Sequence, residues 1–100
     1  MTHMVRYTVK PDQIENNEAL LRELFAELAE TQPPGLHFEA FKLADDGTFI
    51  HLISHDKAAG HLKRPEKLGE FHAGLRERSD GDPLRTELAE IGSYRSPGVS

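Results

Sequence analysis

The first thirty residues combine the apolar spacing of a strand with that of a helix. Residues 4–10 alternate apolar and polar side chains, which predicts a β-strand ending at Pro11. Asp12 and Glu15 then form a capping-box pattern, and apolar residues recur at helical spacing to about Glu30. The predicted apolar stripe consists of Ile14, Leu21, Leu24, Phe25 and Leu28. This part of the chain therefore predicts a strand followed by a long helix.

Two further apolar runs follow the helix, at residues 36–43 and 48–54. The dipeptide Asp46-Gly47 between them favours a two-residue hairpin turn, because a type I′ turn needs positive φ at both central positions. That turn pairs Phe41 with Leu52. Moving the turn back by one residue leaves unchanged which residues share a face.

Both faces of the predicted hairpin are largely apolar. One face carries His37, Glu39, Phe41, Leu43, Ile50 and Leu52. The other carries Leu36, Phe38, Ala40, Phe49, His51, Ile53 and His55. A hairpin with one solvated side would alternate more cleanly. Helices cover one face in a chain of this length, so we expect a second copy of the sheet to cover the other and predict a homodimer.

The second half of the chain repeats the helix-then-strand order. Residues 57–62 predict a short helix, and Pro65 suits the first turn of another, with an apolar stripe of Leu68, Phe71 and Leu75. Residues 84–94 predict a weaker fourth strand, and residues 96–100 a flexible tail. The order β-α-β-β-α-β predicts an α+β, ferredoxin-like domain over residues 4–95 with an antiparallel sheet.

Composition narrows the classes of partner. The 100 residues contain 17 acidic and 12 basic side chains, a formal net charge of −5, and no cysteine. The acidic balance argues against nucleic acid or an anionic membrane as partner, and no apolar run reaches the length of a membrane span. The absence of cysteine excludes disulfides and thiolate metal sites, and it fits a cytoplasmic protein.

Several short motifs resemble the antibiotic biosynthesis monooxygenase (ABM) family of dimeric α+β barrels. They are Val9-Lys10-Pro11, Pro34-Gly35-Leu36, Phe38-Glu39, Phe49-Ile50, and His61-Leu62-Lys63 with Phe71. The resemblance implies a pocket between the sheet and its own helices, and two sheets packed face to face in a dimer. It also implies oxygenation of electron-rich aromatics with O₂, without a metal or flavin. Where family oxygenases often carry Asn and Trp on the third strand, this chain has His51 and His55.

Those two histidines are the leading candidates for chemistry. Cofactor-free oxygenation needs a base that removes a substrate proton and an apolar cavity that holds the resulting anion. Imidazole suits the first role, and we expect His55 to act as base or orienting group with His51 as its partner. The predicted substrate-binding residues are His61, Tyr7, Phe38, Phe49 and Phe71. The predicted ligand is a small aromatic or apolar molecule, and no cofactor is expected.

Other interpretations of the same residues remain open. A non-catalytic ligand-binding module and an isomerase or cyclase are alternatives of the same fold, and a haem-binding role is a more distant one. Each histidine also has a structural interpretation, as a hydrogen-bonded or packing residue, and the basic side chains around Lys67, Arg76 and Arg78 suggest a solvated surface. His51 and His55 lie about 13 Å apart along a strand, too far to share a metal ion, so no metal site is predicted.

Overall fold

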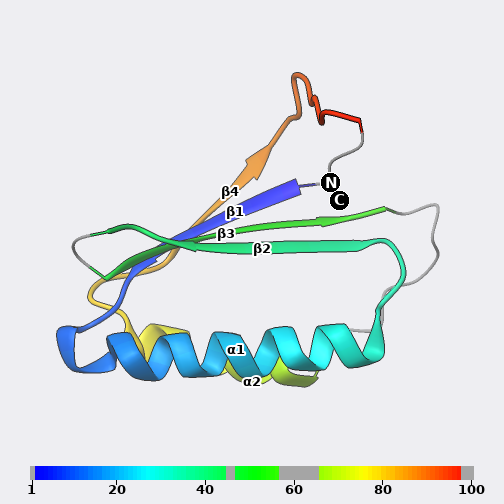
Figure 1. Ribbon diagram of the computed structural model, residues 1–100. Coiled ribbons are helices and arrows are strands. Elements are labelled where there is room, and N and C mark those ends of the chain that lie inside the picture. Colours follow the sequence, from blue (N-terminus) through cyan, green and yellow to red (C-terminus); the bar gives the residue numbers. More distant parts are fainter. Residues whose placement is uncertain (1, 45–46, 57–65, 98–100) are drawn as a thin grey trace.

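The described part of the chain forms a four-stranded sheet with two helices on one of its faces (Figure 1). The computed structural model describes residues 2–44, 47–56 and 66–97. The elements are β1 (Thr2–Thr8), α1 (Ile14–Thr31), β2 (Leu36–Lys42), β3 (Thr48–His55), α2 (Glu66–Arg78) and β4 (Leu84–Leu88). Their order is β-α-β-β-α-β, which confirms the predicted ferredoxin-like α+β arrangement.

The sheet has the order β2-β3-β1-β4, and every neighbouring pair of strands is antiparallel. The predicted division of the hairpin residues between two faces is confirmed. The predicted register is wrong by two residues, because Phe41 pairs with Ile50 and not with Leu52. This is the register of the alternative turn, moved back by one residue.

Gly47 lies where the hairpin approaches the start of α1. Its φ is +75°, its carbonyl accepts the Val9 N–H at 3.1 Å, and a Cβ there would lie 3.1 Å from the side chain of Ile14. The left-handed backbone and the close approach both favour glycine at this position. Gly47 therefore links the hairpin to the segment that leads into α1, while residues 45–46 lie outside the described part of the chain.

The start of α1 differs from the predicted capping box. Pro11 opens a short 3₁₀ turn (Pro11–Gln13) that contains Asp12, so the N-cap position falls on Gln13, which makes no side-chain capping bond. Proline favours the first turn of a helix because it lacks an N–H, and here it starts the helical path before Asp12 can act as cap. At the other end, the left-handed Gln32 returns its N–H to Leu28 at 2.9 Å.

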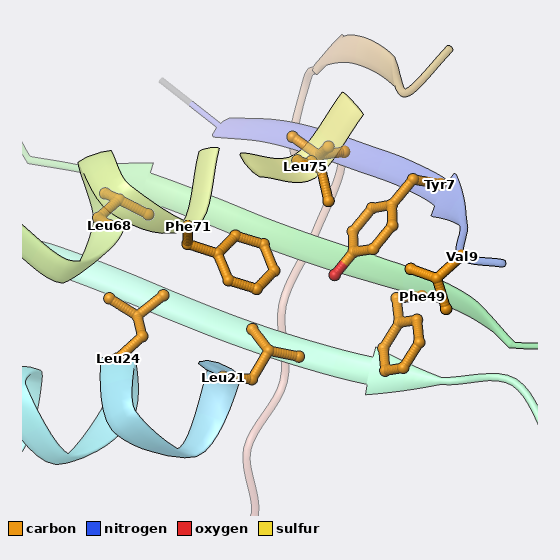
Figure 2. Packing of buried hydrophobic residues seen from close by; sticks show 9 residues of the cluster. Tyr7, Val9, Leu21, Leu24, Phe49, Leu68, Phe71 and Leu75 are labelled. Carbon is orange, nitrogen blue, oxygen red and sulfur yellow. The ribbon is translucent and has the colours of Figure 1, made fainter. Parts of the chain in front are cut away.

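The core lies between the sheet and the helices, where the two predicted apolar stripes meet β1 and β3 (Figure 2). Its buried hydrophobic residues are Val5, Tyr7, Val9, Leu21, Leu24, Phe49, Leu68, Phe71 and Leu75. The stripe predicted for the second helix is thus confirmed. Figure 2 shows the Tyr7 hydroxyl ending inside this layer, among apolar side chains.

The C-terminal strand is shorter than predicted. β4 ends at Leu88, and residues 89–97 are exposed and not in a strand, although residues 84–94 suggested one. Glu90 and Gly92 interrupt the apolar alternation there, so little side-chain burial supports a longer ladder. Figure 1 shows β4 and the following segment leading away from the helices. The helix predicted at residues 57–62 lies outside the described residues.

The sheet face opposite the helices has no cover among the described residues (Figure 1). Phe41 on β2 is 49% exposed and Leu84 on β4 is 65% exposed, while Ile50 and Leu52 between them are half-buried. No described helix is long and apolar enough to cross a membrane.

Candidate functional site

His51 lies at the centre of β3 on the face that packs against the helices, and it is completely buried. Three aromatic rings from three elements surround it. The ring centroid of Tyr7 lies 5.0 Å away in an edge-on arrangement, and those of Phe38 and Phe71 each lie 5.4 Å away. An imidazole held among aromatic side chains is a polar group in a mostly apolar setting, and such groups are costly unless they are hydrogen-bonded.

A chain of buried hydrogen bonds runs from His51 through the core to the end of α2. The Tyr7 hydroxyl lies 2.7 Å from His51 Nε2, and Asn17 Nδ2 donates to that hydroxyl at 3.0 Å. Arg78 Nε in turn donates to Asn17 Oδ1 at 3.2 Å. The four residues come from β3, β1, α1 and α2, so the network ties all layers of the fold together.

Arg78 is a buried cation at one end of this network, with 8% of its surface exposed. Its Nη2 donates to the Phe71 carbonyl at 3.1 Å, and its guanidinium carbon lies 4.7 Å from the Phe71 ring centroid. Gly74 leaves room for it, because a Cβ there would lie 2.5 Å from Arg78 Nη1. Within the described ranges no carboxylate forms an ion pair with Arg78. The prediction that Arg78 belongs to a solvated basic surface is therefore wrong.

Burial sets the charge state of each member of the network. It lowers the pKa of His51 from 6.5 to about 4, with a smaller electrostatic contribution from His72. Burial also raises the pKa of Tyr7 above its ordinary value, against the opposing effects of Asn17 and of the Arg78 charge. The pKa of Arg78 is lowered by burial, but a guanidinium stays protonated in proteins. At neutral pH the network therefore contains a neutral imidazole, a neutral phenol and one cation.

The hydrogen-bond network ends at the second ring nitrogen of His51. His51 Nδ1 is buried and has no hydrogen-bond partner among the described residues. A buried polar atom without a partner costs about 1–3 kcal/mol, so its presence in a core is a feature that needs a reason.

The structure brings most of the predicted site residues together. Tyr7 bonds to His51, and Phe38 and Phe71 pack on it, while Phe49 stacks on Tyr7 with a centroid separation of 5.5 Å. Four of the five residues predicted to bind substrate thus belong to one continuous cluster around His51.

His55 and His61 are less closely joined to this cluster. His55 lies at the end of β3 on the same face as His51, is half-buried, and has a buried Nε2 without a hydrogen-bond partner in the part of the chain that the structure describes. The bonded neighbour of His51 is Tyr7 and not His55. His61 lies outside the described residues.

A cavity of about 640 Å³ lies against the residues that flank His51. Val5 is the cross-strand partner of His51, Ile53 follows it on the same face, and His72 acts on its pKa. All three residues line the cavity, together with His3, Leu68, Leu75, Arg76, Pro83 and Arg85. His51 itself is not in the lining. The lining thus combines apolar side chains with two histidines and two arginines, and one of its residues, Val5, is the cross-strand partner of His51.

Sequence reasoning missed two of the four residues in the network. Asn17 is completely buried, and its side-chain hydrogen bonds to Tyr7 and Arg78 join residues that are 10 and 61 positions away in the chain. The signal that finds them is helical spacing, because Asn17 continues the apolar stripe of α1 and Arg78 that of α2. A polar residue in line with an apolar stripe is buried by its position, and a buried polar group needs partners.

A further histidine, His72, lies beside the aromatic cluster. It lies on α2 next to Phe71, is half-buried, and lines the cavity. Among the described residues, no group of three or more His, Cys, Asp or Glu side chains is placed to hold a metal ion.

No protein-family model and no curated protein sequence matches this chain. Solved structures do match it over nearly their whole length. A protein from Nitrosomonas europaea, provisionally named an antibiotic biosynthesis monooxygenase, is 18% identical with a TM-score of 0.71, over 91% of this chain and 98% of its own. Rv0793 from Mycobacterium tuberculosis is 18% identical with a TM-score of 0.70, over 94% and 97%.

A third similar structure, from Bacteriodes thetaiotaomicron and provisionally given the same name, is 18% identical with a TM-score of 0.68. It covers 100% of this chain and 93% of its own. Identities at this level carry the fold and not the activity. This chain therefore has the fold of the structures named antibiotic biosynthesis monooxygenases.

Proposed function

We propose that this protein is a small cofactor-independent monooxygenase that oxidises an aromatic or quinol-type molecule with O₂. The observation that carries the proposal is the completely buried, neutral His51, hydrogen-bonded at one nitrogen, open at the other and surrounded by aromatic rings. The shared fold with proteins named for this activity supports it. A mostly apolar site with a few placed polar groups is the usual form of a small-molecule site.

The reaction places simple demands on the residues. The substrate loses a proton to a base, and the resulting carbanion transfers an electron to O₂. For an anthrone, the CH₂ group and O₂ become a carbonyl and water, with the substrate itself as the reductant. We assign proton removal to His55, since the Nε2 of His51 is already engaged by Tyr7. His51 orients the substrate, the phenylalanines exclude water, and His61 contacts the substrate at the rim.

A ligand-binding module without catalysis is the second candidate. The specific observation in its favour is that His51 is absent from the lining of the cavity beside it. This function predicts that a ligand raises the thermal stability of the protein without being converted, because binding to the native state alone stabilises it.

We also propose that the active form is a homodimer. The uncovered face of the sheet carries the exposed apolar side chains Phe41 and Leu84, and a second copy of the same face would bury them.

Oxygen consumption on a panel of anthrones, hydroquinones and catechols, with a metal chelator present throughout, tests the enzymatic proposal. We expect uptake above the autoxidation blank, and at least about ten-fold slower uptake in His55→Ala, since general-base catalysis contributes about 10²–10⁴-fold. Asn16→Ala is the control, because Asn16 is exposed on α1 and lies away from the sheet face proposed to form the dimer. Equal rates in the two variants contradict the assignment of His55, and no uptake by the wild type contradicts the proposed activity.

A further inference from the structure

We infer that Arg78, Asn17 and Tyr7 are positioning residues that fix His51 as the Nδ1–H tautomer, so that its ring donates a hydrogen bond to an acceptor oxygen of the ligand. The tautomer is a property of the ligand-free protein, and only the identity of the ligand rests on the proposed function.

Arg78 determines the orientation of the Asn17 amide. A guanidinium has donors only, so the atom of Asn17 that faces Arg78 is the carbonyl oxygen, at 3.2 Å from Arg78 Nε. The amide nitrogen of Asn17 then faces Tyr7 and donates to its hydroxyl oxygen at 3.0 Å. The direction of this bond is therefore set by a charge that does not titrate.

The Tyr7 hydroxyl passes that direction on to His51. Its oxygen already accepts from Asn17, and its one hydrogen points to His51 Nε2 at 2.7 Å, its other hydrogen-bond partner among the described residues. Nε2 is then an acceptor. In a neutral imidazole the other nitrogen carries the proton, so Nδ1 is the donor.

The opposite tautomer leaves more polar atoms without partners. With a proton on Nε2, the Tyr7 oxygen would accept two bonds and its own hydrogen would have no acceptor. His51 Nδ1 would also be a buried acceptor without a partner. The observed contacts therefore favour Nδ1–H by about one hydrogen bond, and we expect a preference of about ten-fold, or ~1.4 kcal/mol.

The chemical class of the ligand follows from this donor. His51 Nδ1 has no partner among the described residues, and the cross-strand partner of His51, Val5, lines a cavity together with Ile53 and His72. An N–H donor in an apolar setting pairs with a carbonyl oxygen or with the oxygen of a phenolate or enolate. An apolar ligand without an acceptor oxygen would leave the donor unpaired.

Nitrogen-15 NMR of the imidazole rings tests the tautomer. The signal of His51 is assigned by its loss in His51→Gln. We expect Nδ1–H in the wild type at neutral pH. In Asn17→Asp the new carboxylate accepts the hydrogen bond of the Tyr7 O–H. The Nε2–H tautomer of His51 should then be about ten-fold more populated than the Nδ1–H tautomer. Asn16→Asp, the same change at the exposed neighbouring residue, should leave the wild-type tautomer.

Three outcomes overturn the inference: an Nε2–H or charged ring in the wild type, an unaltered tautomer in Asn17→Asp, or the same change in Asn16→Asp. Should Asn17→Asp not fold, Tyr7→Phe replaces it, since loss of the hydroxyl removes the donor to Nε2. The Nδ1–H preference must then fall below ten-fold. A ring that keeps its full preference in that variant contradicts the role of Tyr7.

Binding of 1,4-naphthoquinone and naphthalene tests the ligand class. The two molecules are similar in size, and only the quinone has acceptor oxygens; the chain has no cysteine to react with it. We expect the quinone to bind the wild type and Asn16→Asp about ten-fold more tightly than naphthalene, with the preference lost in Asn17→Asp. Equal affinity of the two probes for the wild type, or a preference unaffected by Asn17→Asp, overturns the assignment. Neither result depends on oxygen uptake.

Discussion

Acidification should destabilise this protein through His51 in the range between pH 6.5 and pH 4. Burial holds the pKa of His51 near 4 in the native state, whereas the unfolded chain has the ordinary value near 6.5. Between these values the unfolded state binds a proton that the native state does not, so the free energy of unfolding falls as the pH falls. The loss is about 2 kcal/mol by pH 5 and reaches about 3 kcal/mol below pH 4.

Urea unfolding from pH 7.5 to pH 4.5 measures this loss, with His51→Gln as the reference. The amide of the variant does not titrate, and the other titrating groups are common to both proteins, so the difference between their unfolding free energies isolates His51. We expect the unfolding free energy of the wild type minus that of His51→Gln to decrease by about 2 kcal/mol as the pH falls to 5. A difference that stays constant with pH, or a His51 pKa near 6.5 by NMR, would refute the reasoning.

Three further predictions follow from the packing. Tyr7→Phe should lower the free energy of unfolding by about 1–3 kcal/mol in urea, because it leaves two buried polar partners without a bond; an unchanged stability contradicts the network. Gly69→Ala should stabilise α2 by up to about 1 kcal/mol, since its Cβ meets no atom within 4 Å. Gly74→Ala should lose this gain, because its Cβ would displace the Arg78 side chain. Equal melting temperatures for the two variants would argue against the close fit of Arg78 over Gly74. Light scattering should give twice the chain mass of 11.2 kDa, and the monomer mass would exclude the proposed dimer.

The order and faces of the elements could be predicted from the sequence because they depend on local patterns. The stripe of Leu68, Phe71 and Leu75 and the shared face of His51 and His55 follow from the spacing of side chains along a helix or strand. A register shift of two residues leaves every side chain on the same face of the sheet. The alternation of apolar and polar residues therefore could not distinguish the predicted register from the observed one.

The details that failed depend on contacts between distant parts of the chain. The position of Gly47 is set by its approach to Val9 and Ile14, which no hairpin rule contains. Arg78 and Asn17 are separated by 61 residues, and only the packing of α2 on α1 brings them together. A charged residue near a helix end was predicted to be solvated because its partners were not visible in the local sequence.

The candidate site also combines features that local patterns predict with features that depend on distant contacts. The shared face of the hairpin predicts that His51, His55, Phe38 and Phe49 lie together, and the structure gathers Tyr7, Phe38 and Phe71 around His51, with Phe49 stacked on Tyr7. Their hydrogen-bond directions could not be predicted, because these depend on the two polar residues that complete the helix stripes.

The most direct test of the proposed oxygenation is mass spectrometry of the product formed under ¹⁸O₂ with a chelator present. An anthrone is a suitable substrate, because its CH₂ group becomes a carbonyl in the reaction. The account predicts one ¹⁸O atom in each product molecule, the second oxygen leaving as water, and no turnover without O₂. A product without the label, or equal turnover under anaerobic conditions, would contradict it.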